Sequence, residues 1–532
     1  MDPKVSTGAA PRVSGTAGFL GAARLVGVRK WPVPDPTLGH NRTMELPSDD
    51  VCYRAIATRD VRFDGRLFIG VKTTGIYCRP ICPARTPKRE NVTFWPSAAS
   101  AQEAGFRPCL RCRPEISPDA AAWRGTSNTV SRALALIAEG GLDGDEAGMA
   151  SLCERLGVGE RQLRRLFDKH LGAPPITVAQ TRRILFAKQL IHETQLPMTS
   201  IALASGFGSV RRFNDAFRKL YRRPPSELRR LSAAKSALST VTIRLGYKPP
   251  YDWDAILAFL AARTIANVEI VDRNRYARTI ELDGAFGSVE VAPGKNHLIA
   301  TIRFPRVQSL LSVVARLRRL FDLDADVETI GRHLSGDKAL APLIARRPGL
   351  RAPGAWDGFE LAVRAILGQQ ITVTAARALA VKIVERAGTG ISADLTGDER
   401  LSRIFPSASR MAESDLSSLG MPRARIAALG SLAQAVTEIP KLLEPAGSFD
   451  ETIARLIALP GFGPWTAQYW ALRALRDSDA FPAADVALLR SPAVAQEGKR
   501  PTPKALLQRA ESWRPWRAYA AQHLWTADSE RV

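Results

Sequence analysis

The sequence predicts a multidomain protein that is mainly α-helical, with smaller α+β parts. Three observations lead to this fold class. The chain has 532 residues, enough for three or four domains of roughly 150 residues each. Four of its six cysteines lie between positions 78 and 112. Helix periodicity dominates two long regions, which flank one stretch of alternating apolar residues. We therefore expect a small metal-binding domain, an arginine-rich helical domain, a mixed α/β domain and a second helical domain, in that order. The motifs described below identify the first helical domain as a double helix-turn-helix domain, and a family resemblance implies that the second is a helix-hairpin-helix domain.

The charge balance favours a nucleic-acid partner. The 75 Lys and Arg residues exceed the 52 Asp and Glu residues, which gives a net charge of 75 − 52 = +23. A solvated basic surface without a partner is the alternative explanation. A hydrophobic share of 45% is ordinary for a globular protein and excludes a wholly disordered chain.

No membrane span or secretory signal is predicted. The longest apolar runs, such as 256–262, are much shorter than the roughly 18–20 residues that a span requires. The N-terminus lacks a basic segment followed by an apolar core. We therefore expect a cytoplasmic protein without a membrane partner.

Shifts in composition divide the chain into five segments. Residues 1–44 mix Gly, Pro, Ala and Arg without periodicity and are expected to form a disordered leader. Residues 45–120 hold the clustered cysteines among short apolar runs, and residues 126–235 are helical in pattern and rich in arginine. Residues 238–330 mix strands and helices, whereas 337–530 are helical with breaks at Gly-Pro clusters.

The segment 238–330 is predicted to be an α+β domain. Alternating or continuous apolar residues predict strands near 241–245, 289–291 and 298–302. Helix periodicity predicts helices at 253–263 and 307–321. Strands interleaved with helices in this way indicate a mixed domain rather than a pure helical bundle.

The clustered cysteines have the spacing of a zinc site. Cys78 and Cys82 form one close pair, Cys109 and Cys112 form a second, and 26 residues separate the two pairs. This arrangement allows four sulfurs to converge on one tetrahedral ion, and thiolates favour zinc. We therefore expect one Zn²⁺ per chain, with a plain zinc ribbon as the structural alternative.

Other residues of this region have simpler expected roles. Cys52 and Cys153 fit no ligand spacing and are expected to be small buried residues. Five arginines next to the cluster are expected to offset part of the negative charge of a zinc tetrathiolate: Arg79, Arg85, Arg107, Arg111 and Arg113.

The sequence around the cysteines resembles the N-terminal domain of the Ada adaptive-response family. The resemblance is carried by Thr73–Pro80, Glu90–Phe94 and Gly105–Cys109. It implies that Cys78 irreversibly accepts a methyl group from a methylphosphotriester in DNA. Zinc keeps such a thiol deprotonated, and methylation changes the site from −2 to −1, which turns repair into a binding switch. The resemblance also implies DNA contacts at Thr74, Arg85 and Arg107.

Two helix-turn-helix units are predicted in the arginine-rich segment. In each unit a short helix and a glycine turn precede a basic helix, whose apolar face is expected to be buried. A helix–glycine–helix turn is also common in proteins that do not bind DNA. The paired units, with Ala204–Ser209 in the second, resemble an AraC-type DNA-binding domain. That resemblance implies that the second helix of each unit enters the major groove, with these arginines facing DNA: Arg161, Arg164, Arg165, Arg211 and Arg212.

A glycine hairpin between two helical runs is the main feature of the C-terminal segment. Gly461 and Gly463 stand in the sequence Leu-Pro-Gly-Phe-Gly-Pro-Trp, and such a turn lets backbone N–H groups approach a phosphate. An ordinary glycine turn between packed helices is the alternative. Asp485 follows downstream at a position typical of a helix N-cap, so capping is the alternative to a chemical role.

The hairpin and the aspartate together resemble the helix-hairpin-helix DNA glycosylase superfamily. Ala362–Ile371 and Trp513–Ala520 narrow the resemblance to AlkA-type 3-methyladenine glycosylases. The resemblance implies that an alkylated base is flipped out of the duplex and stacks on aromatic side chains, while a carboxylate stabilises the sugar cation and orients or deprotonates water. Asp485 would be this carboxylate, with Trp465 and Tyr469 in the base pocket.

Two further residues set expectations for the glycosylase domain. Relatives that also cut the strand carry a lysine where this chain has Trp465, so a monofunctional enzyme is expected. The residue that plugs the opened duplex is apolar in well-known members, and Gln370 takes that place here.

The predicted function joins the three resemblances, which cover about 45–530. We expect a sensor and transcriptional activator fused to a glycosylase that excises bases such as 3-methyladenine. Its partners would be double-stranded DNA, both alkylated and operator, and RNA polymerase. Two alternatives are a regulator whose glycosylase module is only a DNA-binding prop, and a glycosylase with an inert zinc module. No Pro-Cys-His-Arg motif occurs, so reversal of O6-methylguanine is not expected.

Overall fold

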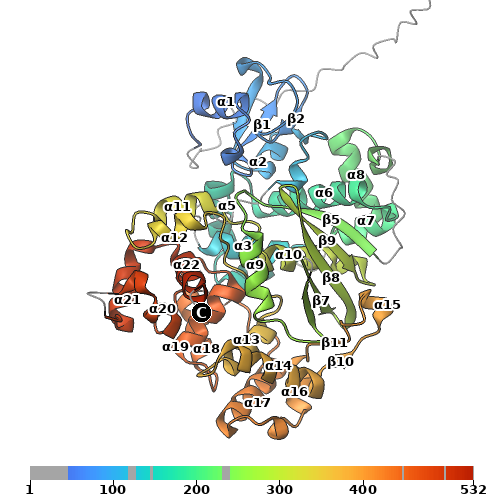
Figure 1. Cartoon of the computed structure of the whole chain (residues 1–532). Coiled ribbons are helices and arrows are strands. Elements are labelled where there is room, and N and C mark those ends of the chain that lie inside the picture. Colours follow the sequence, from blue (N-terminus) through green and yellow to red (C-terminus); the bar gives the residue numbers. More distant parts are fainter. Residues whose placement is uncertain are drawn as a thin grey trace, which may run out of the picture.

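The structure is a computed structural model that describes residues 46–117, 128–143, 148–229, 240–272, 274–445, 448–495 and 499–530. The predicted leader at 1–44 lies outside the described residues. None of the helices in these ranges combines the length and the apolar character that a bilayer crossing demands. The cysteine-containing domain lies at one end of the molecule, next to helices α6–α8, and the C-terminal helices lie on the other side of a five-stranded sheet (Figure 1).

The N-terminal domain is a small sheet packed between two helices. Its strands are in the order β3-β1-β2-β4, with β1 antiparallel to both neighbours and β2 parallel to β4. Small apolar clusters around Cys52 and Tyr77 form its core. The elements are α1 (Asp49–Ala57), β1 (Phe68–Val71), β2 (Ile76–Cys78), β3 (Val92–Trp95), α2 (Ala98–Glu103) and β4 (Arg107–Pro108).

The next domain contains two helix-turn-helix units joined by one long helix. Each second helix buries an aromatic and aliphatic face, with Phe167 and Phe217 fully buried, and leaves its basic face outside. The elements are α3 (Asn128–Ala138), α4 (Met149–Leu156), α5 (Glu160–Leu171), α6 (Pro175–Glu193), α7 (Met198–Ala204) and α8 (Val210–Tyr221).

A five-stranded antiparallel sheet follows, in the order β5-β9-β8-β7-β6. The predicted strands and helices are all present, but β6 and β7 were not predicted. Both carry charged residues that are buried here because they are paired, so the apolar alternation is interrupted. The elements are β5 (Thr240–Gly246), α9 (Trp253–Ala261), β6 (Glu269–Asp272), β7 (Arg275–Leu282), β8 (Ala285–Gly294), β9 (His297–Arg303) and α10 (Leu310–Leu320).

The C-terminal region is helical and has two apolar cores. One core lies around α13, α14, α17 and α19, and the other around α11 and α20–α22. The predicted boundary at 330 falls inside α11, which packs in the second core. The helices are α11 (Val327–Leu334), α12 (Ala341–Arg346), α13 (Gly358–Leu367), α14 (Val373–Ala387), α15 (Ala393–Thr396), α16 (Ala408–Glu413), α17 (Arg423–Glu438), α18 (Phe449–Ile457), α19 (Pro464–Trp470), a π-helix (Ala471–Leu475), α20 (Val486–Arg490), α21 (Pro503–Ala510) and α22 (Arg517–Ser529), with short strands β10 (Thr389–Gly390) and β11 (Arg403–Ile404).

The domains are in direct contact. Helices α6–α8 share one apolar core with the five-stranded sheet and α10. At the end of α6, Glu193 accepts hydrogen bonds from Arg113 of the N-terminal domain, at 2.6 Å, and from the backbone N–H of Arg244 on β5, at 2.9 Å. We call this contact between three domains the Glu193 junction. It places the cysteine domain, the helix-turn-helix domain and the sheet side by side.

Candidate metal centre and base-binding cleft

The four predicted metal ligands converge on one point. The sulfur atoms of Cys78, Cys82, Cys109 and Cys112 all lie within 4.8 Å of one another. Cys78 ends strand β2, and the second pair follows β4, the strand that runs parallel to β2. Backbone N–H groups of Arg79 and Arg111 each point at a sulfur, 3.3 Å from Cys112 and Cys109 respectively. N–H donors toward sulfur stabilise thiolates, so this donor set fits zinc.

The nearby arginines differ from the expectation that all five offset the cluster's charge. Arg79 is buried and forms an ion pair with Asp64, with its Nε 2.8 Å from Oδ1. Arg113 pairs with Glu115 and with Glu193. Carboxylates pair with both of these cations, which reduces the positive charge that they contribute at the cysteine cluster. Two of these carboxylates, Asp64 and Glu193, come from distant positions, so the local sequence did not indicate these ion pairs.

The predicted DNA contacts of this domain lie in different environments. Thr74 is exposed in the turn between β1 and β2, and Arg85 is exposed in the loop after Cys82. Arg107 is half-buried on β4, and burial lowers the pKa of its guanidinium group. Thr74 and Arg85 are therefore accessible to a large partner without rearrangement.

We expect the purified protein to bind one Zn²⁺ per chain. The reason is that four converging sulfurs match the tetrahedral preference of the ion, and the small cores of this domain cannot compensate for losing it. Metal analysis should give a ratio near one, and a strong chelator should unfold residues 46–117 as seen by hydrogen exchange. A ratio well below one with the domain still protected from exchange would contradict the zinc site.

The basic faces of the two recognition helices are exposed. On α5, Arg161, Arg164 and Arg165 all point to solvent, and Arg164 pairs with Glu160 one turn earlier. On α8, Arg211 and Arg212 are also exposed. The helices are amphipathic, so burial of the apolar face forces these arginines outward. Both helices therefore present cationic surfaces suited to a DNA groove.

A cleft of about 1640 Å³ brings the predicted glycosylase residues together. It lies between α9, α13, the hairpin and α22. Residues from both apolar cores of the C-terminal region line it. The predicted members of its wall are Gln370, Gly461, Gly463, Trp465, Tyr469 and Asp485.

The hairpin connects α18 to α19 and requires glycine. Gly461 has a φ of 82°, and a Cβ there would lie 2.5 Å from the Cβ of Ala428. Gly463 is the N-cap of α19, and Pro464 occupies the first turn of that helix. The space around Gly463 is open, so a phosphate can approach the helix N-terminus closely.

Asp485 is both a helix cap and a hydrogen-bond acceptor in the lining of the cleft. Its Oδ1 accepts hydrogen bonds from the backbone N–H groups of Ala487 and Leu488 at the start of α20, at 2.9 and 3.1 Å. The indole Nε1 of Trp525 donates to the same oxygen at 2.9 Å, and that of Trp465 donates to Oδ2 at 2.8 Å. Three donors occupy Oδ1 and one occupies Oδ2, so Oδ2 keeps free acceptor capacity. The capping and chemical interpretations of Asp485 are therefore compatible.

Aromatic rings form one side of the cleft. The rings of Trp465 and Tyr469 stack with centroids 5.4 Å apart and planes at 9°. A base sandwiched between them would need about 7 Å, two contact distances, so a base would stack on the outer face of this pair. Arg473 lies 5.2 Å from the ring of Trp525. Burial would raise the pKa of Tyr469, but the guanidinium groups of Arg473 and Arg263 outweigh it and lower that pKa.

Gln370 lies in the loop 368–372 between α13 and α14. It is exposed and has a φ of 59°, a left-handed conformation that is uncommon outside glycine. The neighbouring Gln369 donates to the carbonyl of Gly461 at 2.7 Å and to the hydroxyl of Thr466 at 3.1 Å. The loop and the hairpin are thus tied together beside the cleft.

Sequence reasoning missed two residues of this site, Trp525 and Gln369. Trp525 stands on α22, 40 positions after Asp485, and only the fold brings its indole to the carboxylate. Gln369 lies within the motif Ala362–Ile371, but nothing in that motif separates the residue that bonds the hairpin from the one that faces solvent. An indole on a helix rich in alanine was the one available signal for Trp525.

Comparisons with known proteins find matches to separate parts of the chain. Three family models match it: the metal binding domain of Ada over residues 51–115, a helix-turn-helix domain over 152–231, and the AlkA N-terminal domain over 242–357. The probable bifunctional transcriptional activator/DNA repair enzyme AlkA of Mycobacterium tuberculosis is 40% identical over 480 residues, which cover 89% of this chain and 95% of that protein.

Two Escherichia coli proteins match separate parts. DNA-3-methyladenine glycosylase 2 is 35% identical over 291 residues, which are 53% of this chain and 95% of that protein. The bifunctional transcriptional activator/DNA repair enzyme Ada is 33% identical over 160 residues, which are 30% of this chain and 43% of that protein.

The zinc-type cysteine cluster, the paired helix-turn-helix units and the helix-hairpin-helix cleft define a DNA-binding regulator joined to a base-excision glycosylase fold. The predicted resemblances to the Ada and AlkA families are confirmed, as is the helix-turn-helix domain. The chain belongs to the family of bifunctional transcriptional activators and DNA repair enzymes of the AlkA type.

Proposed function

We propose that the protein senses methylated DNA, activates transcription and excises alkylated bases. The observation that carries the glycosylase part is Asp485, held by two indoles and two backbone N–H groups in a cleft beside a glycine hairpin. Both oxygens of this carboxylate are fixed in orientation, and Oδ2, with a single donor, keeps acceptor capacity. A preorganised anion of this kind stabilises positive charge that develops on a sugar.

The excision follows from this geometry. An alkylated purine such as N3-methyladenine carries positive charge, so it leaves readily once it is flipped out of the duplex. The base stacks on the face of the Trp465–Tyr469 pair. The C1′–N bond breaks and its electron pair departs with the base, while Asp485 Oδ2 stabilises the sugar cation. Water then adds to C1′, and its proton passes to the carboxylate.

The sensing step uses Cys78. Zinc, when bound by the four cysteines, keeps their sulfurs as thiolates at neutral pH. The Cys78 sulfur attacks the methyl carbon of a methylphosphotriester, and the methyl–oxygen bond breaks. The products are a thioether at Cys78 and a DNA phosphodiester that keeps the electron pair. Thr74 and Arg85, both exposed near this site, are proposed to contact the DNA backbone together with Arg107.

The regulatory part uses the exposed arginines of α5 and α8, which read operator DNA in two major-groove segments. Methylation removes one negative charge from the cysteine cluster and so reduces repulsion from phosphates. The DNA-bound form then recruits RNA polymerase. The bacterial DNA repair and transcription proteins that the chain resembles support the cytoplasm as its site of action.

Product analysis tests this function. Wild-type protein and duplex DNA with N7-methylguanine or N3-methyladenine should yield the free base and an intact strand with an abasic site. No protein–DNA adduct should be trapped by borohydride, because Trp465 offers no amine where strand-cutting relatives have lysine. Chromatography of the base and a denaturing gel, run with and without alkali, measure both products. A trapped adduct would contradict a monofunctional enzyme.

The main alternative is a regulator whose glycosylase module only binds DNA. The same assay separates the two functions, because a DNA-binding prop releases no base from any substrate. The four hydrogen bonds that orient Asp485 favour the enzyme, since capping of α20 alone would use only the two from the backbone.

A further inference from the structure

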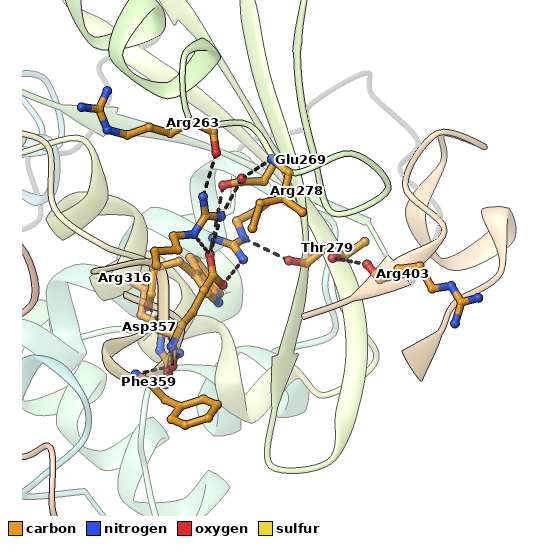
Figure 2. A network of polar contacts seen from close by, with 12 residues as sticks. Arg263, Glu269, Arg278, Thr279, Arg316, Asp357, Phe359 and Arg403 are labelled. Atoms are coloured by element: carbon orange, nitrogen blue, oxygen red, sulfur yellow. Dashed lines mark hydrogen bonds and ion pairs between the residues drawn. The ribbon is translucent and has the colours of Figure 1, made fainter. Parts of the chain in front are cut away.

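A buried network of charges joins helix α13 to the five-stranded sheet (Figure 2). Glu269 of β6 and Arg278 of β7 come from the sheet, and Glu360 and Arg364 come from α13. We call these four residues the anchor quartet. One guanidinium nitrogen of Arg364 lies 2.7 Å from both Glu269 Oε2 and Glu360 Oε1, and Arg278 donates to Glu360 Oε2 at 2.6 Å. The two negative and two positive charges of the anchor quartet cancel, so the quartet has no net charge.

The quartet fixes its geometry more narrowly than apolar packing would. Glu269, Arg278 and Glu360 are all buried. Burial would raise the pKa of Glu360, but the guanidinium groups of Arg278 and Arg364 outweigh it and hold that pKa at about 2. Glu360 therefore stays charged at neutral pH. Planar guanidinium groups with several hydrogen bonds specify direction as well as distance, so α13 has little freedom to rotate or slide.

Helix α13 leads directly into the loop 368–372. Glu360, Arg364 and Gly368 are spaced four residues apart and so lie along one face of the helix. At its start, Asp357 caps α13 through the N–H groups of Phe359 and Glu360. At its end, the loop is bonded to the hairpin, as described for Gln369. Because α13 is anchored on the sheet and continues into the loop, the position of the sheet fixes the position of the loop.

We propose that the anchor quartet positions the loop 368–372 for opening the DNA duplex, so that Arg364 governs extrusion of a paired base. The inference rests on the proposed glycosylase function. All four members of the quartet also line the cleft. We assign them as positioning residues because their charged groups are bonded to one another, and Arg364 also donates to the backbone carbonyl of Arg263. Insertion between base pairs is sensitive to small displacements, and a shift of about 1 Å can lower a rate by roughly 10²-fold.

The test compares two substrates. Arg364→Gln removes one cation from the quartet and keeps a polar side chain. Release of N7-methylguanine from duplex DNA should fall by about tenfold or more, an effect in the range expected of a misplaced group. Release from a single strand, which needs no duplex opening, should change by less than about twofold. Arg364→Lys restores the charge but not the fork of hydrogen bonds, so it should recover part of the duplex rate.

Two further variants make the comparison specific. Arg275→Gln removes the same chemical group as Arg364→Gln, from strand β7, which also carries Arg278 of the quartet. Arg275 pairs with Asp272, Glu290 and Asp398, none of which is on α13. It should leave the ratio of duplex to single-strand release unchanged. Gln369→Ala disturbs the loop without touching the quartet, and it should lower the same ratio.

The outcomes decide between a positioning role and a merely structural one. If Arg364→Gln releases less base from duplex and single-stranded DNA by the same factor, the inference is overturned, because the substitution would then act on the base pocket or on folding. If thermal unfolding shows that Arg364→Gln does not fold, Gln369→Ala decides, and an unchanged ratio in that variant overturns the inference. If the wild type releases no base from either substrate, the glycosylase function itself fails.

Discussion

Replacing Asp485 with asparagine is expected to lower release of 3-methyladenine from duplex DNA by several orders of magnitude. One preorganised electrostatic group is typically worth roughly 10²–10³ in rate, and loss of the base that accepts the water proton adds to this. The amide oxygen of asparagine can keep the bonds to Ala487 and Leu488, so the cap of α20 survives. Its NH₂ group would face the indole N–H of Trp465. Both groups are hydrogen-bond donors, so the bond from Trp465 would be lost.

Binding and a matched variant serve as controls. Affinity for duplex DNA with an abasic site should stay close to wild type, because the hairpin at Gly461 and Gly463 does not involve the carboxylate. Asp252→Asn is the matched change, since Asp252 caps α9 through a side-chain bond to Ala255 and does not line the cleft. It should keep full excision. If Asp485→Asn were as active as wild type, Asp485 would serve only as a helix cap. That result would favour the alternative in which the protein is a regulator whose glycosylase module only binds DNA.

Replacing Cys78 with alanine is expected to abolish methyl transfer from methylphosphotriester DNA. The wild type should take up one methyl group per chain, and peptide mass spectrometry should place it on Cys78. Operator affinity of the methylated protein should rise, and the gain should shrink as salt increases, because its cause is one charge near phosphate. The base-release assay should be unaffected, since the cysteines and the cleft lie in different domains.

Cys52 and Cys153 provide the controls for this experiment. Burial, with a smaller effect of Asp49, raises the pKa of Cys52 to about 11, and burial also raises the pKa of Cys153. Both are therefore protonated and poorly nucleophilic at neutral pH. Cys52→Ala and Cys153→Ala should accept methyl groups as the wild type does. A methyl group found on Cys82, Cys109 or Cys112 would contradict the assignment of Cys78 as the acceptor.

Much of the candidate site could be predicted because its chemistry sits in short, local patterns. The metal ligands occur as two close pairs, and the hairpin glycines lie within three positions of each other. The rest depends on distant contacts. Trp525 reaches Asp485 only through the packing of α22 against α20. Strand β7 was missed because Arg278 interrupts its apolar pattern. Its burial depends on the carboxylates of Glu360, 82 positions away, and Glu269 on the neighbouring strand.

The charge balance of the cysteine domain also depends on distant contacts that the sequence does not reveal. Arg79 and Arg113 were expected to balance the cluster, and their local sequence supports that expectation. Their partners are the neighbouring Glu115 and two carboxylates, Asp64 and Glu193, which the fold brings from 15 and 80 positions away. A count of nearby charges therefore overstates the positive field at the metal site.

The Glu193 junction has a consequence for the kinetics of target search. Proteins that bind DNA through phosphate contacts slide and hop along it, and each encounter with a given site takes time. The junction holds the methyl-acceptor domain, the operator-reading domain and the sheet of the glycosylase side by side. A molecule that slides along DNA is therefore expected to bring all three domains to the same stretch of DNA. Detection and repair then share a single search, so a chain that meets a cluster of lesions can report one and excise another before it dissociates.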